Sequence, residues 1–150
     1  MSGNNNPVYS KVGDVQSGAG VVIGPSANTA QDGTGANTYM VFQADTTNGG
    51  LLQKLIARTI GSPAATVMRI YICTVTGAFT PGTSNTAATT YLIDEITLPA
   101  QTLSQVAAAI GFQVAMNLMM PPGYRILVSF GTSTGAAGTG YVVTGAGGKY

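Results

Sequence analysis

The chain has 150 residues, 45% of them hydrophobic, a length and composition that fit one domain around a single core. Only 7% of the residues are charged, against about 25% in a typical globular domain, and the formal net charge is +1. The Lys and Arg residues are scattered, which argues against nucleic-acid binding. A near-neutral surface repels its neighbours weakly, so the composition favours a protein that packs against others.

The residue types that bind metals or form disulfides are almost missing. There is no histidine and a single cysteine, Cys73, so we expect no intrachain disulfide, no metal and no cofactor. The N-terminus lacks the basic and apolar regions of a signal peptide. No apolar run reaches the roughly 20 residues that a membrane-spanning helix needs. We therefore expect a protein made in a reducing cytoplasm, with no membrane partner.

Residues 1–20 are predicted to form an extended N-terminal arm, ahead of a β domain over residues 21–150. Asn, Ser and Gly dominate the arm, and its few apolar side chains cannot support folding alone. We expect the arm to become ordered against a neighbouring subunit or another partner. The residues predicted to make this contact are Asn6, Pro7, Val8, Tyr9, Val12 and Val15.

Eight strands are predicted from runs of β-branched and aromatic residues between Gly, Pro and Asn turns. Their expected bounds are 20–23, 38–44, 51–60, 66–76, 89–98, 112–120, 124–130 and 141–144, followed by a tail over 145–150. Strands of this number and spacing favour an all-β, jelly-roll-like sandwich.

The strand 66–76 is rich in apolar residues on both faces. One face, predicted to point into the core, carries Met68, Ile70 and Ile72. The opposite face carries Val67, Arg69, Tyr71, Cys73 and Val75. This second face is more apolar than a solvent-exposed face usually is. Its residues Val67, Tyr71 and Val75 are therefore predicted to contact another subunit.

A short helix is predicted near residues 102–110. Thr102 and Gln105 have the spacing of a capping box, in which two side chains satisfy free backbone amides. The apolar residues after the cap repeat at helical spacing: Leu103, Val106, Ala107 and Ile110. In the strand that follows, alternation places Met116 and Met120 in the core and Met119 on the other face.

Candidate catalytic groups are sparse. Asp94 and Glu95 are adjacent acids, but successive strand side chains point to opposite faces, so they do not form a carboxylate pair. Whichever of them faces inward is expected to pair with an arginine, because an unpaired buried charge is costly. Cys73 lies within a strand and has no histidine to activate it, so we expect an inert residue. No enzymatic activity is expected.

Several segments carry a family resemblance: DGTGANTYMVFQA (32–44), LLQKLIARTIG (51–61), TVMRIYI (66–72), EITLPAQTLSQVAA (95–108) and LMMPPGYRILVSFGT (118–132). Together they resemble a group of small head decoration, or cement, proteins of tailed bacteriophages. The resemblance implies a jelly-roll-like fold and an oligomer, with a trimer favoured. It also implies attachment to the major capsid protein.

We therefore expect a structural virion protein that binds the outside of a phage capsid and stabilises it. Two alternatives remain open. The first is another virion component, in the neck or the tail. The second is a carbohydrate-binding β-sandwich module, which the absence of tryptophan disfavours but which seven tyrosines leave possible.

Overall fold

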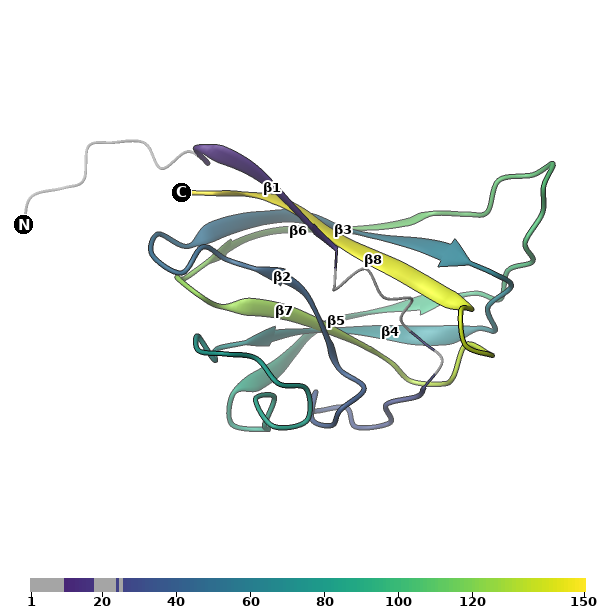
Figure 1. Cartoon of the computed structure of the whole chain (residues 1–150), viewed down its shortest axis with the longest axis horizontal. Helices are drawn as coiled ribbons and strands as arrows, with labels where there is room; N and C mark the ends of the chain where they lie inside the picture. The colour runs from purple at the N-terminus through teal and green to yellow at the C-terminus, as the bar shows by residue number, and fades with distance from the viewer. Residues whose placement is uncertain (1–9, 18–23, 25) are drawn as a thin grey trace, which may run out of the picture.

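The computed structural model describes residues 10–17, 24 and 26–150, and these residues form a two-layered β-sandwich (Figure 1). All strand pairs are antiparallel. The strands are β1 (Val12–Ser17), β2 (Tyr39–Gln43), β3 (Gly50–Ile60), β4 (Thr66–Cys73), β5 (Thr90–Leu98), β6 (Phe112–Met120), β7 (Arg125–Phe130) and β8 (Gly140–Lys149). The prediction of an all-β sandwich is confirmed.

The two sheets have four strands each. The first sheet has the order β1-β8-β3-β6, and the second sheet has the order β2-β7-β4-β5. Each strand of the N-terminal half pairs with the strand that lies equally far from the other end: β1 with β8, β2 with β7, β3 with β6 and β4 with β5. The chain thus resembles one long hairpin that has been rolled up, with only the β4–β5 connection staying within a sheet.

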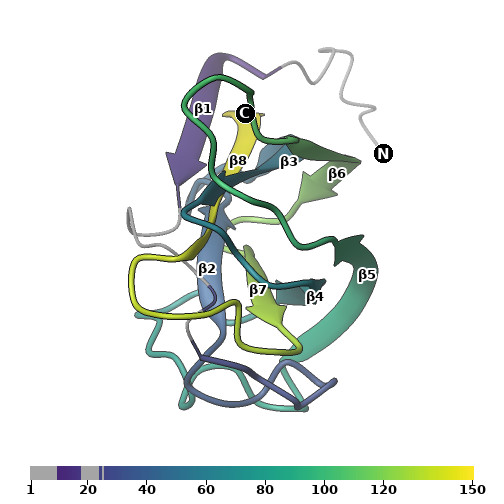
Figure 2. The same ribbon diagram turned by 90° about the vertical axis from the view of Figure 1, so that its right-hand side faces the viewer.

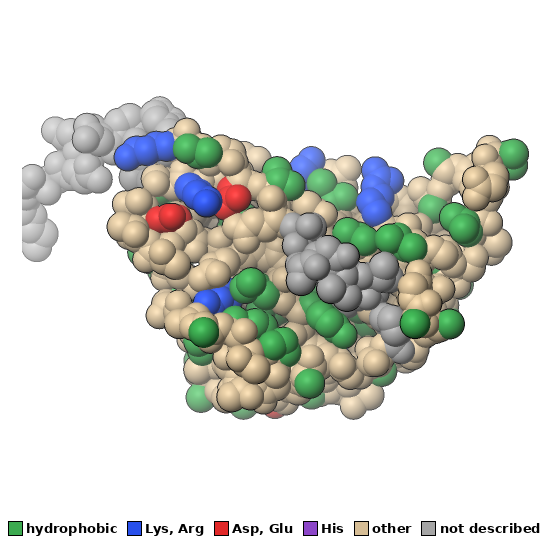
Figure 3. All heavy atoms as spheres, viewed as in Figure 1, with side chains coloured by type: hydrophobic (Ala, Val, Ile, Leu, Met, Phe, Trp, Pro, Cys, Tyr) green, Lys and Arg blue, Asp and Glu red, His purple; other side chains and the backbone are tan. Residues whose placement is uncertain are grey.

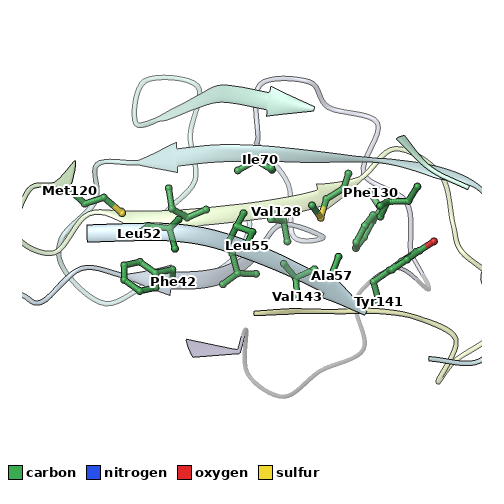
Figure 4. Close-up of a cluster of buried hydrophobic side chains, with 14 of the residues drawn as sticks. Phe42, Leu52, Leu55, Ala57, Ile70, Met120, Val128, Phe130, Tyr141 and Val143 are labelled. Atoms are coloured by element: carbon green, nitrogen blue, oxygen red, sulfur yellow. The ribbon is translucent and has the colours of Figure 1, made fainter. Parts of the chain in front are cut away.

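The core lies between the inward faces of the two sheets (Figure 4). From the first sheet, β3 contributes Leu52 and Leu55, which are fully buried. From the second sheet, β4 contributes Met68 and Ile70, as its sequence predicts. Burying one such side chain stabilises the fold by about 1.5–3 kcal/mol. The core therefore holds the two sheets together.

Strand β6 confirms the predicted alternation. Its inward residues pack against the core and are half-buried, whereas every second residue is exposed. Met120 is buried, and Met119, on the opposite face, is 71% exposed. The inward face of β6 is therefore less well covered than the inward face of the neighbouring β3.

The helix predicted near residues 102–110 is wrong. Residues 101–111 form an irregular loop, in which the Ser104 hydroxyl accepts hydrogen bonds from the amides of Val106 (3.2 Å) and Ala107 (3.1 Å). Helices of fewer than about 12 residues are marginal in water unless an apolar face packs against something. Here the apolar residues of the loop are exposed to solvent, so nothing stabilises the helical conformation.

Both ends of the β domain also differ from prediction. The strand expected over 20–23 lies outside the described residues, while part of the expected arm forms β1 at the edge of the first sheet. The predicted tail over 145–150 is wrong, because β8 continues to Lys149. A Cβ atom on Gly147 would overlap the backbone carbonyl of Leu51. The glycines that suggest a loose end in the sequence instead permit close packing of neighbouring strands.

Candidate partner-binding surfaces

The described part of the predicted arm contributes two exposed apolar side chains. Val12 and Val15 lie on β1, and Val15 is 73% exposed. Strand β1 pairs with β8 over its whole length, with Val15 opposite Ala146. The arm residues Asn6, Pro7, Val8 and Tyr9 lie outside the described residues. These two valines are thus presented at a sheet edge, where a partner could reach them.

Tyr71 is buried within its own chain rather than presented to a partner. Its side chain is fully buried, and its hydroxyl group lies 3.2 Å from the Ser129 hydroxyl and 3.3 Å from the Ala30 carbonyl. The loop before β2 covers the ring, since a Cβ atom on Gly33 would come within 2.9 Å of it. Burial raises the pKa of the Tyr71 phenol above its ordinary value. At Tyr71, packing within the chain therefore explains why the second face of this strand is apolar.

The loop after β4 closes the other half of this face. Val75 and Phe79 pack against a small buried cluster formed by Tyr71, Cys73 and Leu127. The buried Arg125 guanidinium donates hydrogen bonds to the carbonyl oxygens of Val75 and Gly77 and lies 5.7 Å from the Phe79 ring centre. Arg125 thus fixes the loop over the sheet, and Val75 is packed within the chain.

Val67, the remaining residue predicted on this face, lines a shallow depression of about 360 Å³. Arg69 borders the same depression, and its guanidinium bonds the Glu95 carboxylate at 2.7 Å and the Asn28 carbonyl at 3.2 Å. Because the arginine is already neutralised by an acid of its own chain, the depression offers a partner mainly apolar contact.

The pairing predicted for the inward-facing acid is wrong. Asp94 lies opposite Ile70 in the register, on the inward side of β5, yet it is exposed. It has no ion pair among the described residues, and its carboxylate accepts only the Glu95 amide, at 2.8 Å. The arginine pairs instead with Glu95. Asp94 tolerates this position because the first sheet does not cover it.

A polar depression of about 260 Å³ lies where β1 and β2 meet, lined by Gln16, Gln43, Ala44, Asp45, Thr46 and Lys149. The Gln16 amide exchanges two 2.8 Å hydrogen bonds with the Gln43 backbone, which ties the two sheets together on this side. The amides of Asn48 and Thr47 donate to the Asp45 carboxylate and lower its pKa. Gln16, Gln43 and Asp45, which line this depression, therefore already form hydrogen bonds within the chain.

The outer face of the first sheet is mostly uncharged. It is formed by the side chains that alternate with the core positions: Val15, Leu51, Lys54, Ile56, Arg58, Ala115, Met119, Val142, Thr144 and Ala146. Lys54 donates a 3.3 Å hydrogen bond to Gln113 on the neighbouring strand. Figure 3 shows Lys and Arg side chains along the upper part of the molecule, where Figure 1 places this sheet. The face combines apolar area with a small positive charge.

On the side of the sandwich formed by β5 and β6, the two sheets are not bridged. Figure 2 shows both strands at the same side of the molecule, one at the edge of each sheet. Within the described ranges, no hydrogen bond joins β5 to β6. We call this region the open edge and define it by the partly exposed or exposed side chains Tyr91, Ile93, Asp94, Ile96, Val114 and Met116.

The loop between β5 and β6 projects from the body at one end of the open edge (Figure 1), and hydrophobic side chains lie at its tip (Figure 3). Leu103, Val106 and Ile110 are 56%, 97% and 63% exposed. Sequence reasoning misses this surface because it assigns the three residues to a short helix. The sequence does hold one signal for this surface: the three residues have helical spacing, but no apolar segment is placed to pack against them.

Cys73 is buried, as its position in the strand predicts. Within residues 10–17, 24 and 26–150, no three His, Cys, Asp or Glu side chains gather closely enough to hold a metal ion. Over the same part of the chain, no helix is both long and apolar enough to cross a membrane. Comparisons with family models, with curated proteins and with solved structures find no match.

Proposed function

We propose that the chain is a structural virion protein of a tailed bacteriophage, a decoration protein that binds the outside of the capsid and stabilises it. The partner is the major capsid protein, and the chain acts as a homo-oligomer, with a trimer favoured. The resemblance of residues 32–132 to phage decoration proteins supports this proposal.

The strand order also supports it. Two four-stranded sheets with the orders β1-β8-β3-β6 and β2-β7-β4-β5 correspond to a jelly roll, which recurs in viral capsid and lectin domains. Because the same architecture serves several unrelated functions, the fold agrees with a virion role without specifying it.

The observation that carries the proposal is the outer face of the first sheet. Exposed apolar side chains that gather on one face, as Val15 and Met119 do here, commonly mark a protein contact. Among the described residues of this face, only Lys54 and Arg58 are charged, so few ions lose water on binding. Their positive charge would also complement an acidic patch on the shell. A nearly uncharged face of this kind suits a static contact with a large surface.

The direct test is an electron cryomicroscopy structure of the phage particle that contains this chain. The expected result is density for the sandwich on the outside of the capsid, with the first sheet toward the shell. Density at the neck or tail would replace the decoration role with the alternative virion location. Absence of the chain from particles, together with binding on a glycan array, would favour a carbohydrate-binding module.

A pair of variants tests the contact face. Ile56→Glu places a charge on the outer face of the first sheet, whereas Ala87→Glu places the same charge on an exposed loop of the second sheet. We expect Ile56→Glu to reduce binding to assembled capsids at least tenfold in a co-sedimentation assay and Ala87→Glu to leave it unchanged. Equal binding by both variants would exclude this face.

A further inference from the structure

We propose that two copies of the chain associate head to tail, with the loop of residues 101–111 from one copy packing into the open edge of the next. The inference rests on the oligomer in the proposed function, but it is tested on the isolated chain. Self-association can therefore fail while capsid binding holds, and the reverse.

The loop is built to present its apolar residues. The Gln101 side chain bridges its base, with the carboxamide donating to the Ile110 carbonyl (3.1 Å) and accepting from the Ile110 amide (2.9 Å). The Leu103 amide donates to the Ser62 hydroxyl at 2.9 Å, which fixes the start of the loop. Between these anchors, the eight residues 102–109 project from the body. The loop is thus held outward rather than folded onto its own chain.

The apolar side chains of the loop form one continuous stripe only when the loop is helical. Leu103, Val106 and Ile110 are spaced by three and four residues, and such residues share a face of a helix. In the isolated chain this face has no partner among the described residues. Contact with an apolar surface of a second copy would supply one. The segment can therefore become helical on association, which breaks the Gln101–Ile110 hydrogen bonds, because a helix places these two residues about 13.5 Å apart.

The open edge supplies a surface of matching chemistry. Ile96, Val114 and Met116 belong to the core-facing side of the sandwich but are only partly buried. Tyr91 and Ile93 extend the same region and are exposed. An apolar segment that packs along the edge would complete the burial of side chains that the single chain leaves half covered.

Charge complementarity selects a second copy of this chain as the occupant. The Arg58 guanidinium lies directly against Gly111 at the base of the loop and has no ion pair among the described residues. Asp94 is the acid of the open edge that likewise has no ion pair there. When the loop of one copy enters the open edge of the next, Arg58 beside the start of β6 faces the Asp94 carboxylate of that next copy. Each chain thus carries a positive charge beside its loop and a negative charge at its open edge, neither with an ion pair among the described residues. This arrangement fits a contact between identical chains.

The contact uses side chains rather than addition of a strand to a free edge. Strand β5 carries a bulge between the pairs Ile70–Asp94 and Tyr71–Leu92, and two acids follow it. Strand β6 has Asn117 at a positive φ of 46°. Bulges, charges and irregular backbone all discourage edge-to-edge pairing. Packing of an apolar loop against the open edge requires no pairing of strand edges, so these features do not prevent it.

The two surfaces lie on different parts of the chain, so the contact is heterologous. Heterologous contacts close into rings when the rotation between copies permits and otherwise give open chains. A ring of three would agree with the proposed trimer. This contact uses Arg58 at one end of the outer face of the first sheet and leaves the rest of that face free.

Sedimentation velocity of the full chain between about 1 and 100 µM tests the contact. We expect the unmodified chain to form oligomers. Val106→Asp, which alters the loop tip, and Asp94→Arg, which alters the edge, should each weaken association at least tenfold. Thr83→Asp changes an exposed residue of the loop between β4 and β5, outside both surfaces, and should have no effect. Circular dichroism of each variant verifies the fold. Val106 is exposed, so Val106→Asp should not disturb folding.

Mixing distinguishes the head-to-tail contact from a symmetric one. An equimolar mixture of Val106→Asp and Asp94→Arg retains one intact loop and one intact edge, so it should form a one-to-one dimer that cannot grow. The double variant Arg58→Asp with Asp94→Arg should regain association. A monomeric unmodified chain at 100 µM, or unchanged association of Val106→Asp, would overturn the inference. A mixture that stays monomeric would overturn the head-to-tail geometry.

Discussion

At the scale of single residues, the side chains with buried polar atoms explain how the loops are held over the second sheet. Arg125 is nearly fully buried but has no carboxylate partner among the described residues. Backbone carbonyl oxygens of the loop after β4 surround its guanidinium instead. Burial lowers the pKa of Arg125 from its ordinary value, but an arginine guanidinium stays protonated in proteins. The charge therefore serves to order a loop that has few apolar anchors.

Replacing this arginine should loosen the loop. Arg125→Ala removes several charge-assisted hydrogen bonds and the contact with Phe79, and we expect a loss of about 3 kcal/mol in the free energy of unfolding. Urea denaturation measures it. Arg58→Ala is the matched control, because Arg58 is exposed and has no ion pair within the described chain, and its effect should stay within about 0.5 kcal/mol. Similar losses for both arginines would contradict the anchoring role.

The buried phenol of Tyr71 predicts a pH dependence. Because burial raises its pKa in the folded state, the unfolded chain releases the Tyr71 proton at a lower pH than the folded chain does. The stability contributed by Tyr71 is therefore complete below about pH 10 and is lost as the pH rises through the folded-state pKa. The free energy of unfolding should fall above about pH 10.

The Tyr71→Phe variant isolates this contribution. It keeps the ring but removes the hydroxyl, so it should lose about 1 kcal/mol near neutral pH and show a shallower decline at alkaline pH. Some decline should remain, because burial also raises the pKa of Tyr141. Urea denaturation at a series of pH values measures both effects. A decline as steep as that of the unmodified chain would exclude Tyr71 as a source.

At the scale of secondary-structure elements, close packing against a neighbouring strand explains Gly147 in β8. Gly147 faces the carbonyl of Leu51, with no room for a side chain, whereas a methyl group added to Gly13 on β1 would have no atom within 4 Å. Gly147→Ala should therefore destabilise the fold by about 1–3 kcal/mol through overpacking. Gly13→Ala should be neutral or stabilise it by up to about 1 kcal/mol. Thermal unfolding of both variants compares them directly, and equal melting temperatures would refute the steric argument.

The elements that the sequence predicts well are those whose pattern reflects burial. The predicted bounds of strand β6 match the observed ones, because one face packs on the core and the other meets solvent. Strand β1 is not predicted because Val12 and Val15 do not alternate, and its pairing with β8 holds it in place instead. The glycines of β8 suggest a flexible tail because their close contacts involve residues far away in the chain.

The same distinction applies to the candidate surfaces. Tyr71 and Val75 have the pattern of an interface, but a loop distant in sequence covers Tyr71, and Val75 lies in a loop that packs back onto the same cluster. No local pattern reports either arrangement. The segment 101–111 has the pattern of a helix, but the sequence alone does not reveal that nothing in the described chain covers it. The outer face of the first sheet depends on which strands are neighbours. That order follows from the topology and not from any one strand.

At the scale of the whole molecule, strand order predicts which end of the chain the fold needs. Strand β8 lies between β1 and β3, so the last strand is internal to the first sheet. The pairing of Val12 with Lys149 joins residues near opposite ends of the chain. Contacts this distant in sequence form late and slowly. The first sheet is therefore complete only after the C-terminal strand has been inserted.

Two truncations compare an internal strand with an edge strand. Deleting residues 140–150 removes β8, which frees one hydrogen-bonding edge of β3 and leaves β1 without a partner, so we expect a chain that does not unfold cooperatively. Among the described residues, deleting residues 1–17 removes the edge strand β1, its Asp14–Lys149 ion pair and the Gln16 bridge to Gln43, so a folded domain of lower stability should remain. Urea denaturation and the dispersion of amide proton resonances report both results. A cooperative transition in the chain that ends at residue 139 would mean that the second sheet folds without the first.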